Sequence, residues 1–134
     1  MKPCSILIVE DPPFQHLYLQ NRFSELGDCH LESARAGEEA LACLKKSDFD
    51  LVLTDLLMPG MDGVQFIQGL AALPSPPALA IMSAASRRML MGASLVASNL
   101  QVKVIGLISK PVNAAALRCL TDQLQALRQV APAE

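Results

Sequence analysis

The sequence is poor in aromatic residues, and this shortage constrains its core. The 134-residue chain has no tryptophan, one tyrosine and four phenylalanines, although 51% of its residues are hydrophobic. The core must therefore be aliphatic, built from leucine, isoleucine, valine, alanine and methionine. A chain of this length is expected to form one domain with a single hydrophobic core.

Concentrated charge and long apolar runs are also missing. The formal net charge is −2, and the only adjacent basic pairs, Lys45-Lys46 and Arg87-Arg88, are typical of solvated helix surface. Direct nucleic-acid binding needs a clustered basic face and is therefore not expected. No apolar run is long enough to span a membrane, and the one in MKPCSILIVED is too short for a signal peptide. We expect a cytoplasmic protein without a membrane segment.

The chain has no cysteine motif. Its four cysteines are scattered, none in C-x-x-C spacing, and neither His16 nor His30 completes a plausible metal cluster with them. In a cytosolic chain they are expected to be small buried hydrophobes with reduced thiols. They are Cys4, Cys29, Cys43 and Cys119.

What the sequence does contain is an alternation of short apolar runs and longer amphipathic segments. Short apolar runs bounded by turn residues are typical of strands buried on both faces of a parallel sheet. Five β–α units in series predict an α/β fold with right-handed crossovers and helices on both faces. The predicted strands are 5–9, 29–34 (a more polar edge strand), 50–54, 78–82 and 104–108, and helical stripes lie in 14–26, 62–73, 86–99 and 117–127, the last preceded by Asn113 as N-cap.

Four of these strands end in polar residues, namely Glu10-Asp11, Asp55, Ser83 and Lys110. Singly, each has an ordinary explanation, such as a helix cap for Asp11, a turn for Asp55 and a helix N-cap for Ser83. Together they would share the sheet edge where doubly wound folds bind ligands. Clustered carboxylates repel one another unless a cation such as Mg²⁺ lies among them, and a nearby lysine can bind an anion. The set predicts a phosphoryl-binding site with a potential carboxylate nucleophile.

The motifs ILIVED, LVLTDLLMPGMDG, AIMSA and LISKP occur in the order found in one family. On these motifs the chain resembles the receiver (CheY-like) domain of two-component response regulators over residues 5–127. The resemblance implies a doubly wound, five-stranded parallel sheet of flavodoxin-like order 2-1-3-4-5 with five helices. We expect a receiver domain over residues 1–129, followed at 130–134 either by a tail or by the start of a linker to an output domain.

The resemblance implies a role for each polar strand end. Asp55 would be the phosphoacceptor, attacking the phosphorus of a kinase phosphohistidine, while Ser83 and Lys110 would bind phosphoryl oxygens. The remaining expected residues are metal ligands for Mg²⁺: Asp11 directly, Glu10 through water, Asp55 itself and the backbone carbonyl of Leu57. A sensor histidine kinase or phosphotransfer protein would be the phosphoryl donor.

Two features depart from the family pattern. In the family an aromatic switch residue stands three positions before the lysine, and here that position is Leu107, which has no ring and no hydroxyl. By their positions, Ser83 and Leu107 are the expected switch residues. The spacing from Ser83 to Lys110, 27 positions, suggests a lengthened fourth helix or following loop. Together these features are similar to receivers joined to an EAL-type cyclic-di-GMP phosphodiesterase domain. A homodimer through the fourth helix, fifth strand and fifth helix is a further expected partner.

Other functional classes fit less well. A haloacid-dehalogenase-type enzyme needs a second Asp two positions after the first, where this chain has Leu57. A dinucleotide-binding module lacks a G-x-G-x-x-G motif after the first strand. The alternative that stays open is a pseudo-receiver, a protein-interaction module that is never phosphorylated. In either case the chain would be a signalling domain. A phosphoaccepting receiver would in addition catalyse its own phosphorylation and dephosphorylation.

Overall fold

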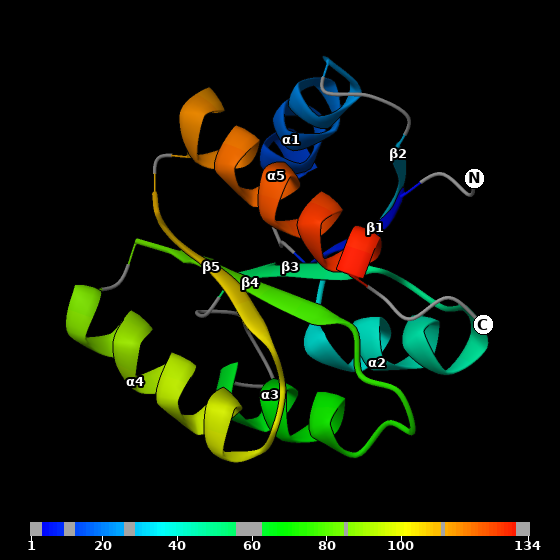
Figure 1. The fold of residues 1–134 in the computed structure, drawn as a ribbon, viewed down its shortest axis with the longest axis vertical. Helices are drawn as coiled ribbons and strands as arrows, with labels where there is room; N and C mark the ends of the chain where they lie inside the picture. The colour runs from blue at the N-terminus through cyan, green and yellow to red at the C-terminus, as the bar shows by residue number, and fades with distance from the viewer. Residues whose placement is uncertain are drawn as a thin grey trace.

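The computed structural model describes residues 4–9, 13–25, 29–55, 63–84, 86–110 and 112–130, with side chains for all of these except 13–16, 25 and 128–130. Strands and helices alternate along the described part of the chain (Figure 1). The elements are β1 (Cys4–Val9), α1 (Pro13–Glu25), β2 (Cys29–Ala34), α2 (Gly37–Lys46), β3 (Leu51–Asp55), α3 (Gly63–Ala71), β4 (Ala78–Ser83), α4 (Arg87–Asn99), β5 (Val104–Ser109) and α5 (Ala114–Val130).

The five strands form one parallel sheet in the order β2-β1-β3-β4-β5, which confirms the predicted fold. β3 lies at the centre and all five of its residues are buried, as expected for a strand covered on both faces. β2 lies at an edge, and most of its residues are only partly buried or exposed. This difference explains why the sequence of β2 is the most polar of the five strands.

Helices cover both faces of the sheet, with α1 and α5 on one side and α2, α3 and α4 on the other (Figure 1). Each side has its own buried cluster, and the largest side chain in each is a phenylalanine, Phe23 from α1 and Phe66 from α3. The other large, fully buried side chains are leucines and isoleucines. The core is therefore aliphatic, as the composition predicts.

Side chains cap the N-termini of α4 and α5. The Asn113 side chain accepts a hydrogen bond from the Ala116 N–H at 2.8 Å, which confirms Asn113 as the N-cap of α5. At α4 the cap is Ser86, whose hydroxyl accepts from the Met89 N–H at 3.3 Å. Ser83 is instead the last residue of β4 and is fully buried, so the alternative of Ser83 as a helix N-cap is wrong.

The expectation of four buried cysteines is only partly correct. Cys4 is buried and Cys29 and Cys43 are half-buried, but Cys119 is exposed. Cys119 lies on α5, next to Arg118, which is also exposed, on the outer side of the helix. Helical periodicity, which places Leu117 and Leu120 inward, puts Cys119 outward.

None of the helices in the described part of the chain combines the length and the apolar content that crossing a membrane requires. The most extended of them, α5, has 17 residues and turns exposed polar side chains such as Gln123 outward.

Candidate functional site

Three of the predicted polar strand ends lie at the same edge of the sheet. Asp55 is the last residue of β3, Ser83 is the last residue of β4, and Lys110 directly follows β5. The three strands are consecutive neighbours, with Asp55 opposite Met82 and Ser83 opposite Ser109 in the parallel register. Because parallel strands end at the same side, their last residues converge there.

Asp55 and Lys110 form an ion pair at this edge. The Lys110 Nζ donates a hydrogen bond to Asp55 Oδ2 at 2.7 Å, and the two side chains are only 16% and 12% exposed, respectively. These residues are 55 positions apart in the chain. An ion pair so well shielded from water interacts more strongly than an exposed one, although desolvation opposes this gain. The pairing fixes the orientation of the Asp55 carboxylate beside the Lys110 ammonium group.

The backbone connects Lys110 to Ser83. The Lys110 N–H donates to the Ser83 carbonyl at 2.9 Å, which continues the hydrogen bonding between β4 and β5 by one residue. On the β3 side, the buried Thr54 hydroxyl donates to the Asp55 carbonyl at 3.0 Å. These hydrogen bonds to backbone carbonyls help to position Lys110 and Asp55, whose side chains form the ion pair.

Tyr18, the only tyrosine of the chain, contacts the segment after Lys110. Its hydroxyl donates a hydrogen bond to the Val112 carbonyl at 3.1 Å, and the Arg22 guanidinium lies 5.4 Å from the centre of its ring. This bond ties α1 to the connection between β5 and α5. Sequence reasoning missed it, because no periodicity links two residues that are 94 positions apart.

The predicted switch residue Leu107 lies on β5 opposite Ile81 of β4. Its side chain is 39% exposed, whereas Ile81 is fully buried. Ala84, next to Ser83, is also exposed. The position expected to hold an aromatic ring is therefore occupied by an aliphatic side chain at the protein surface.

The other expected ligands, Glu10, Asp11 and Leu57, lie outside the described residues. The last described residue before Glu10 is Val9 of β1, which is paired with Thr54 of β3. Among the described residues no group of three or more His, Cys, Asp or Glu side chains could hold a metal ion. Asp55 is the expected ligand that lies within the described residues, and its carboxylate oxygens are of the type that Mg²⁺ prefers.

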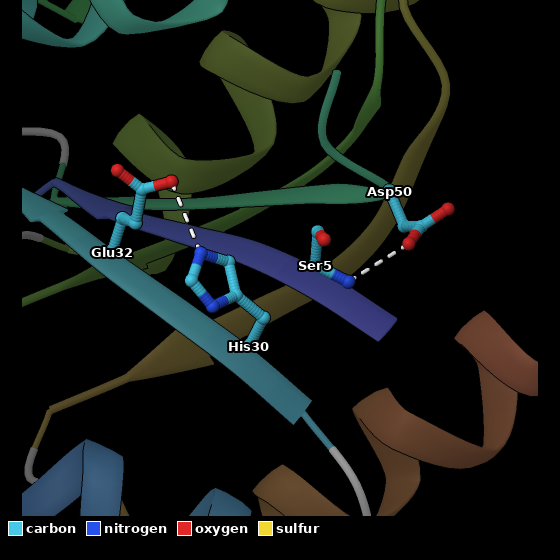
Figure 2. Close-up of polar contacts among 4 residues, drawn as sticks. All are labelled: Ser5, His30, Glu32 and Asp50. Carbon is cyan, nitrogen blue, oxygen red and sulfur yellow. Dashed lines mark hydrogen bonds and ion pairs between the residues drawn. The ribbon is translucent and has the colours of Figure 1, made fainter. Parts of the chain in front are cut away.

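A different set of polar contacts lies toward the amino ends of β1, β2 and β3 (Figure 2). The Asp50 carboxylate accepts a hydrogen bond from the Ser5 N–H at 2.8 Å. On β2, the His30 ring and the Glu32 carboxylate lie 3.2 Å apart, with both side chains largely exposed. These contacts are a backbone cap and a surface pair, both of which have ordinary structural explanations.

A hollow of about 880 Å³ opens at this same end of the strands. Its lining comes from the loops that precede β3 and β4, from Lys103 before β5, and from Leu124 and Leu127 of α5. Lysine and aspartate side chains are both present in the lining, so it has no dominant charge. No sequence motif marks the hollow, because its lining is assembled from separate segments.

Comparison with known proteins gives a consistent result. The model of the response regulator receiver domain family matches residues 6–122. The chemotaxis protein CheY-3 of Vibrio cholerae is 36% identical over 126 residues, which cover 92% of each chain. The positive alginate biosynthesis regulatory protein of Pseudomonas aeruginosa is 33% identical over 110 residues, covering 81% of this chain but 42% of that protein.

Solved structures agree. A receiver domain protein from Methanospirillum hungatei superposes with a TM-score of 0.80 at 22% identity, covering 96% of this chain and 98% of that one, and so shares the fold. The response regulator protein TrrA of Thermotoga maritima, solved in complex with Mg²⁺ and BeF, has a TM-score of 0.75 and 25% identity over 90% of this chain and 98% of its own. With the matched motifs, the sheet order and these relatives in agreement, the chain belongs to the response regulator receiver domain family.

Proposed function

We propose that this receiver domain is a phosphoacceptor, which takes a phosphoryl group from the phosphohistidine of a sensor kinase or phosphotransfer protein onto Asp55. A bond forms between an Asp55 carboxylate oxygen and phosphorus, while the bond from phosphorus to the histidine nitrogen breaks. The observation that carries the proposal is the ion pair between Lys110 and Asp55 at the carboxyl edge of the sheet. A carboxylate held at the end of a buried strand, beside a cation, is suited to this reaction.

Lys110 would act both before and after the transfer. Its ammonium group, 2.7 Å from Asp55 Oδ2, orients the carboxylate in the unphosphorylated protein. Transfer places negatively charged phosphoryl oxygens beside the same ammonium group, which can then pair with one of them. Catalysis of this kind depends mainly on positioning and charge neutralisation.

The proposed magnesium site would be formed by Asp11, by Glu10 through water, by Asp55 and by the Leu57 carbonyl. When bound, Mg²⁺ supplies positive charge that stabilises the transferring phosphoryl group. The Asp55 carboxylate suits such an ion, and the structural relative TrrA was solved with Mg²⁺ and BeF.

The proposed response to phosphorylation begins at Ser83, whose hydroxyl would bind a phosphoryl oxygen. Because the Lys110 N–H donates to the Ser83 carbonyl, movement at the end of β4 would be transmitted to the end of β5. Leu107 on β5 would change its packing in this shift, without the hydroxyl contact that a tyrosine could make. The outcome would be a shift in the population of two conformations.

The signal would be received by an output domain or a partner. CheY-3 is matched over 92% of its length and the alginate regulatory protein over 42%, so relatives include chains of this size and longer ones. We propose a receiver unit over residues 1–129, a linker that begins at 130–134, and an output domain of the EAL phosphodiesterase type. A homodimer through α4, β5 and α5 is the alternative assembly, supported by the exposed side chains of Met91 and Leu95 on α4. The proposed transfer from a sensor kinase places the chain in the cytoplasm, where the kinase domain of a sensor operates.

Incubation with acetyl phosphate and Mg²⁺, followed by intact-mass measurement, tests the proposal. The wild-type chain should gain the mass of one phosphoryl group in an acid-stable, base-labile form. Asp55→Asn should gain none, because an amide oxygen is not a comparable nucleophile, and EDTA should suppress the gain. A wild-type chain that stays unlabelled while a control receiver is labelled would contradict the proposal and favour a pseudo-receiver.

A further inference from the structure

Two cysteines lie opposite each other on adjacent strands, far from the phosphorylation site. Cys4 begins β1 and Cys29 begins β2, and the two residues are paired in the parallel register. The next residues of each strand, Ser5 and His30, are visible side by side in Figure 2. Asp55 and Lys110 lie where their strands end, whereas Cys4 and Cys29 lie where their strands begin. This cysteine pair therefore has no part in the proposed phosphoryl chemistry.

Both cysteine side chains lie on the same face of the sheet. Successive side chains of a strand alternate between faces, and register partners on parallel strands point the same way. Cys4 belongs to the buried cluster beneath α1 and α5, and Cys29 packs against that cluster. His30, the residue after Cys29, points to the other face.

The Cα spacing of register partners falls within the range found in disulfides. Neighbouring strands of a sheet lie about 4.8 Å apart. Disulfide-bonded cysteines have Cα atoms about 4.4–6.8 Å apart. Both cysteines are in the thiol form in this structure. We propose that Cys4 and Cys29 constitute an oxidation site, at which a peroxide converts the two thiols into an intramolecular disulfide that joins β1 to β2.

The exposure of the two thiols sets the order of the reaction. Cys4 is 9% exposed, whereas Cys29 is half-buried and is the one that a small oxidant can reach. The Cys29 thiolate attacks hydrogen peroxide, which forms a sulfenic acid and releases hydroxide. The Cys4 thiolate then attacks the Cys29 sulfur, forming the S–S bond and displacing the sulfenic oxygen as water after protonation. Peroxide is thus reduced by two electrons and the two thiols are oxidised by two electrons.

The bond would fasten an edge strand of the sheet to its neighbour. β2 lies at the edge and pairs only with β1, and α1 is the segment between the two cysteines in the chain. A disulfide would enclose α1 in a covalent loop and would restrict the opening of the β1–α1–β2 unit. The oxidised protein should therefore melt at a higher temperature than the reduced protein.

The other two cysteines are poor alternatives. Cys43 lies on α2 and packs against the cluster on the opposite face of the sheet. Cys119 is exposed on α5 and is therefore a source of disulfides between molecules. The test uses the full chain with Cys43→Ala and Cys119→Ser, so that only the proposed pair remains.

Treatment of this variant with hydrogen peroxide, followed by alkylation under denaturing conditions, measures the thiols that survive. Both thiols should disappear together, with a mass loss of two hydrogen atoms, no dimer on a non-reducing gel and full recovery with dithiothreitol. Adding Cys4→Ala should stop the reaction at Cys29, whose sulfenic acid is then trapped by dimedone. Adding Cys29→Ser should leave the Cys4 thiol intact at the same dose.

Peptide mapping of the oxidised wild-type chain should identify a linked Cys4–Cys29 peptide. Survival of both thiols at a peroxide dose that oxidises Cys119 would overturn the proposal. A sulfinic acid at Cys29 beside an unmodified Cys4 thiol would also overturn it, as would a disulfide that joins any other pair.

Discussion

The two ends of β3 carry the same residue type in contrasting surroundings. Asp50 precedes the strand and Asp55 ends it, and each carboxylate accepts a short hydrogen bond, at 2.8 Å and 2.7 Å respectively. The donor to Asp50 is the backbone N–H of Ser5, whereas the donor to Asp55 is the ammonium group of Lys110. A backbone donor makes Asp50 a structural cap. A charged donor, Lys110 directly after β5, makes Asp55 a candidate for chemistry.

The largest expected difference between the two aspartates is in phosphorylation. With acetyl phosphate and Mg²⁺, Asp55→Asn should abolish labelling, while Asp50→Asn should label like the wild type. The Asn side chain at position 50 still offers an oxygen to the Ser5 N–H, so the fold should be preserved. Loss of labelling in Asp50→Asn, with an unchanged circular dichroism spectrum, would show that the amino edge contributes to the reaction.

A second comparison concerns two lysines at opposite ends of β5, Lys110 after the strand and Lys103 before it. Lys110→Met should reduce the rate of labelling about 100-fold, because it removes a positioned charge from the transferring phosphoryl group. Lys103→Met, which changes a lysine in the hollow at the amino end of β5, should leave the rate unchanged. Rates are measured by intact mass over time at fixed acetyl phosphate. Equal rates for Lys110→Met and the wild type would remove Lys110 from the proposed mechanism.

The structural role of Asp50 can be measured separately. Asp50→Ala should lower the free energy of unfolding by about 1 kcal/mol, because the half-buried Ser5 N–H loses its acceptor. Urea denaturation followed by circular dichroism provides the measurement. Asp48→Ala is the matched control, since Asp48 is exposed and its removal should change stability by less than about 0.5 kcal/mol. If the two variants are equally stable, the Asp50 contact does not contribute.

The last comparison concerns two smaller effects, at Tyr18 and at Glu32. Tyr18→Phe removes only the hydroxyl that donates to the Val112 carbonyl, and should lower the free energy of unfolding by about 0.5–1 kcal/mol. Glu32→Gln, which weakens an exposed pair with His30, should cost less than Tyr18→Phe in the same urea denaturation. A larger loss in Glu32→Gln would reverse this order and show that the surface pair supports the edge strand.

Sequence patterns predicted the strands well because each buried strand is a continuous apolar run. β2 was predicted at its observed bounds, 29–34, even though it is the most polar strand. α2 had no predicted range, although its composition carries a signal: Glu38 and Glu39 lie in the first turn and Lys45 and Lys46 in the last, matching the helix dipole. The N-cap at Asn113 was predictable because capping is local.

By itself, the sequence determined the α/β alternation and the polar residues that end the strands, because hydrophobic periodicity and turn chemistry act over a few neighbouring residues. Only the tertiary structure decided which of these residues meet. It brought Lys110 within 2.7 Å of Asp55, placed Tyr18 against Val112 and paired Cys4 with Cys29. These contacts join distant parts of the chain, and they depend on strand order and register, which emerge when the sheet and its helices pack together.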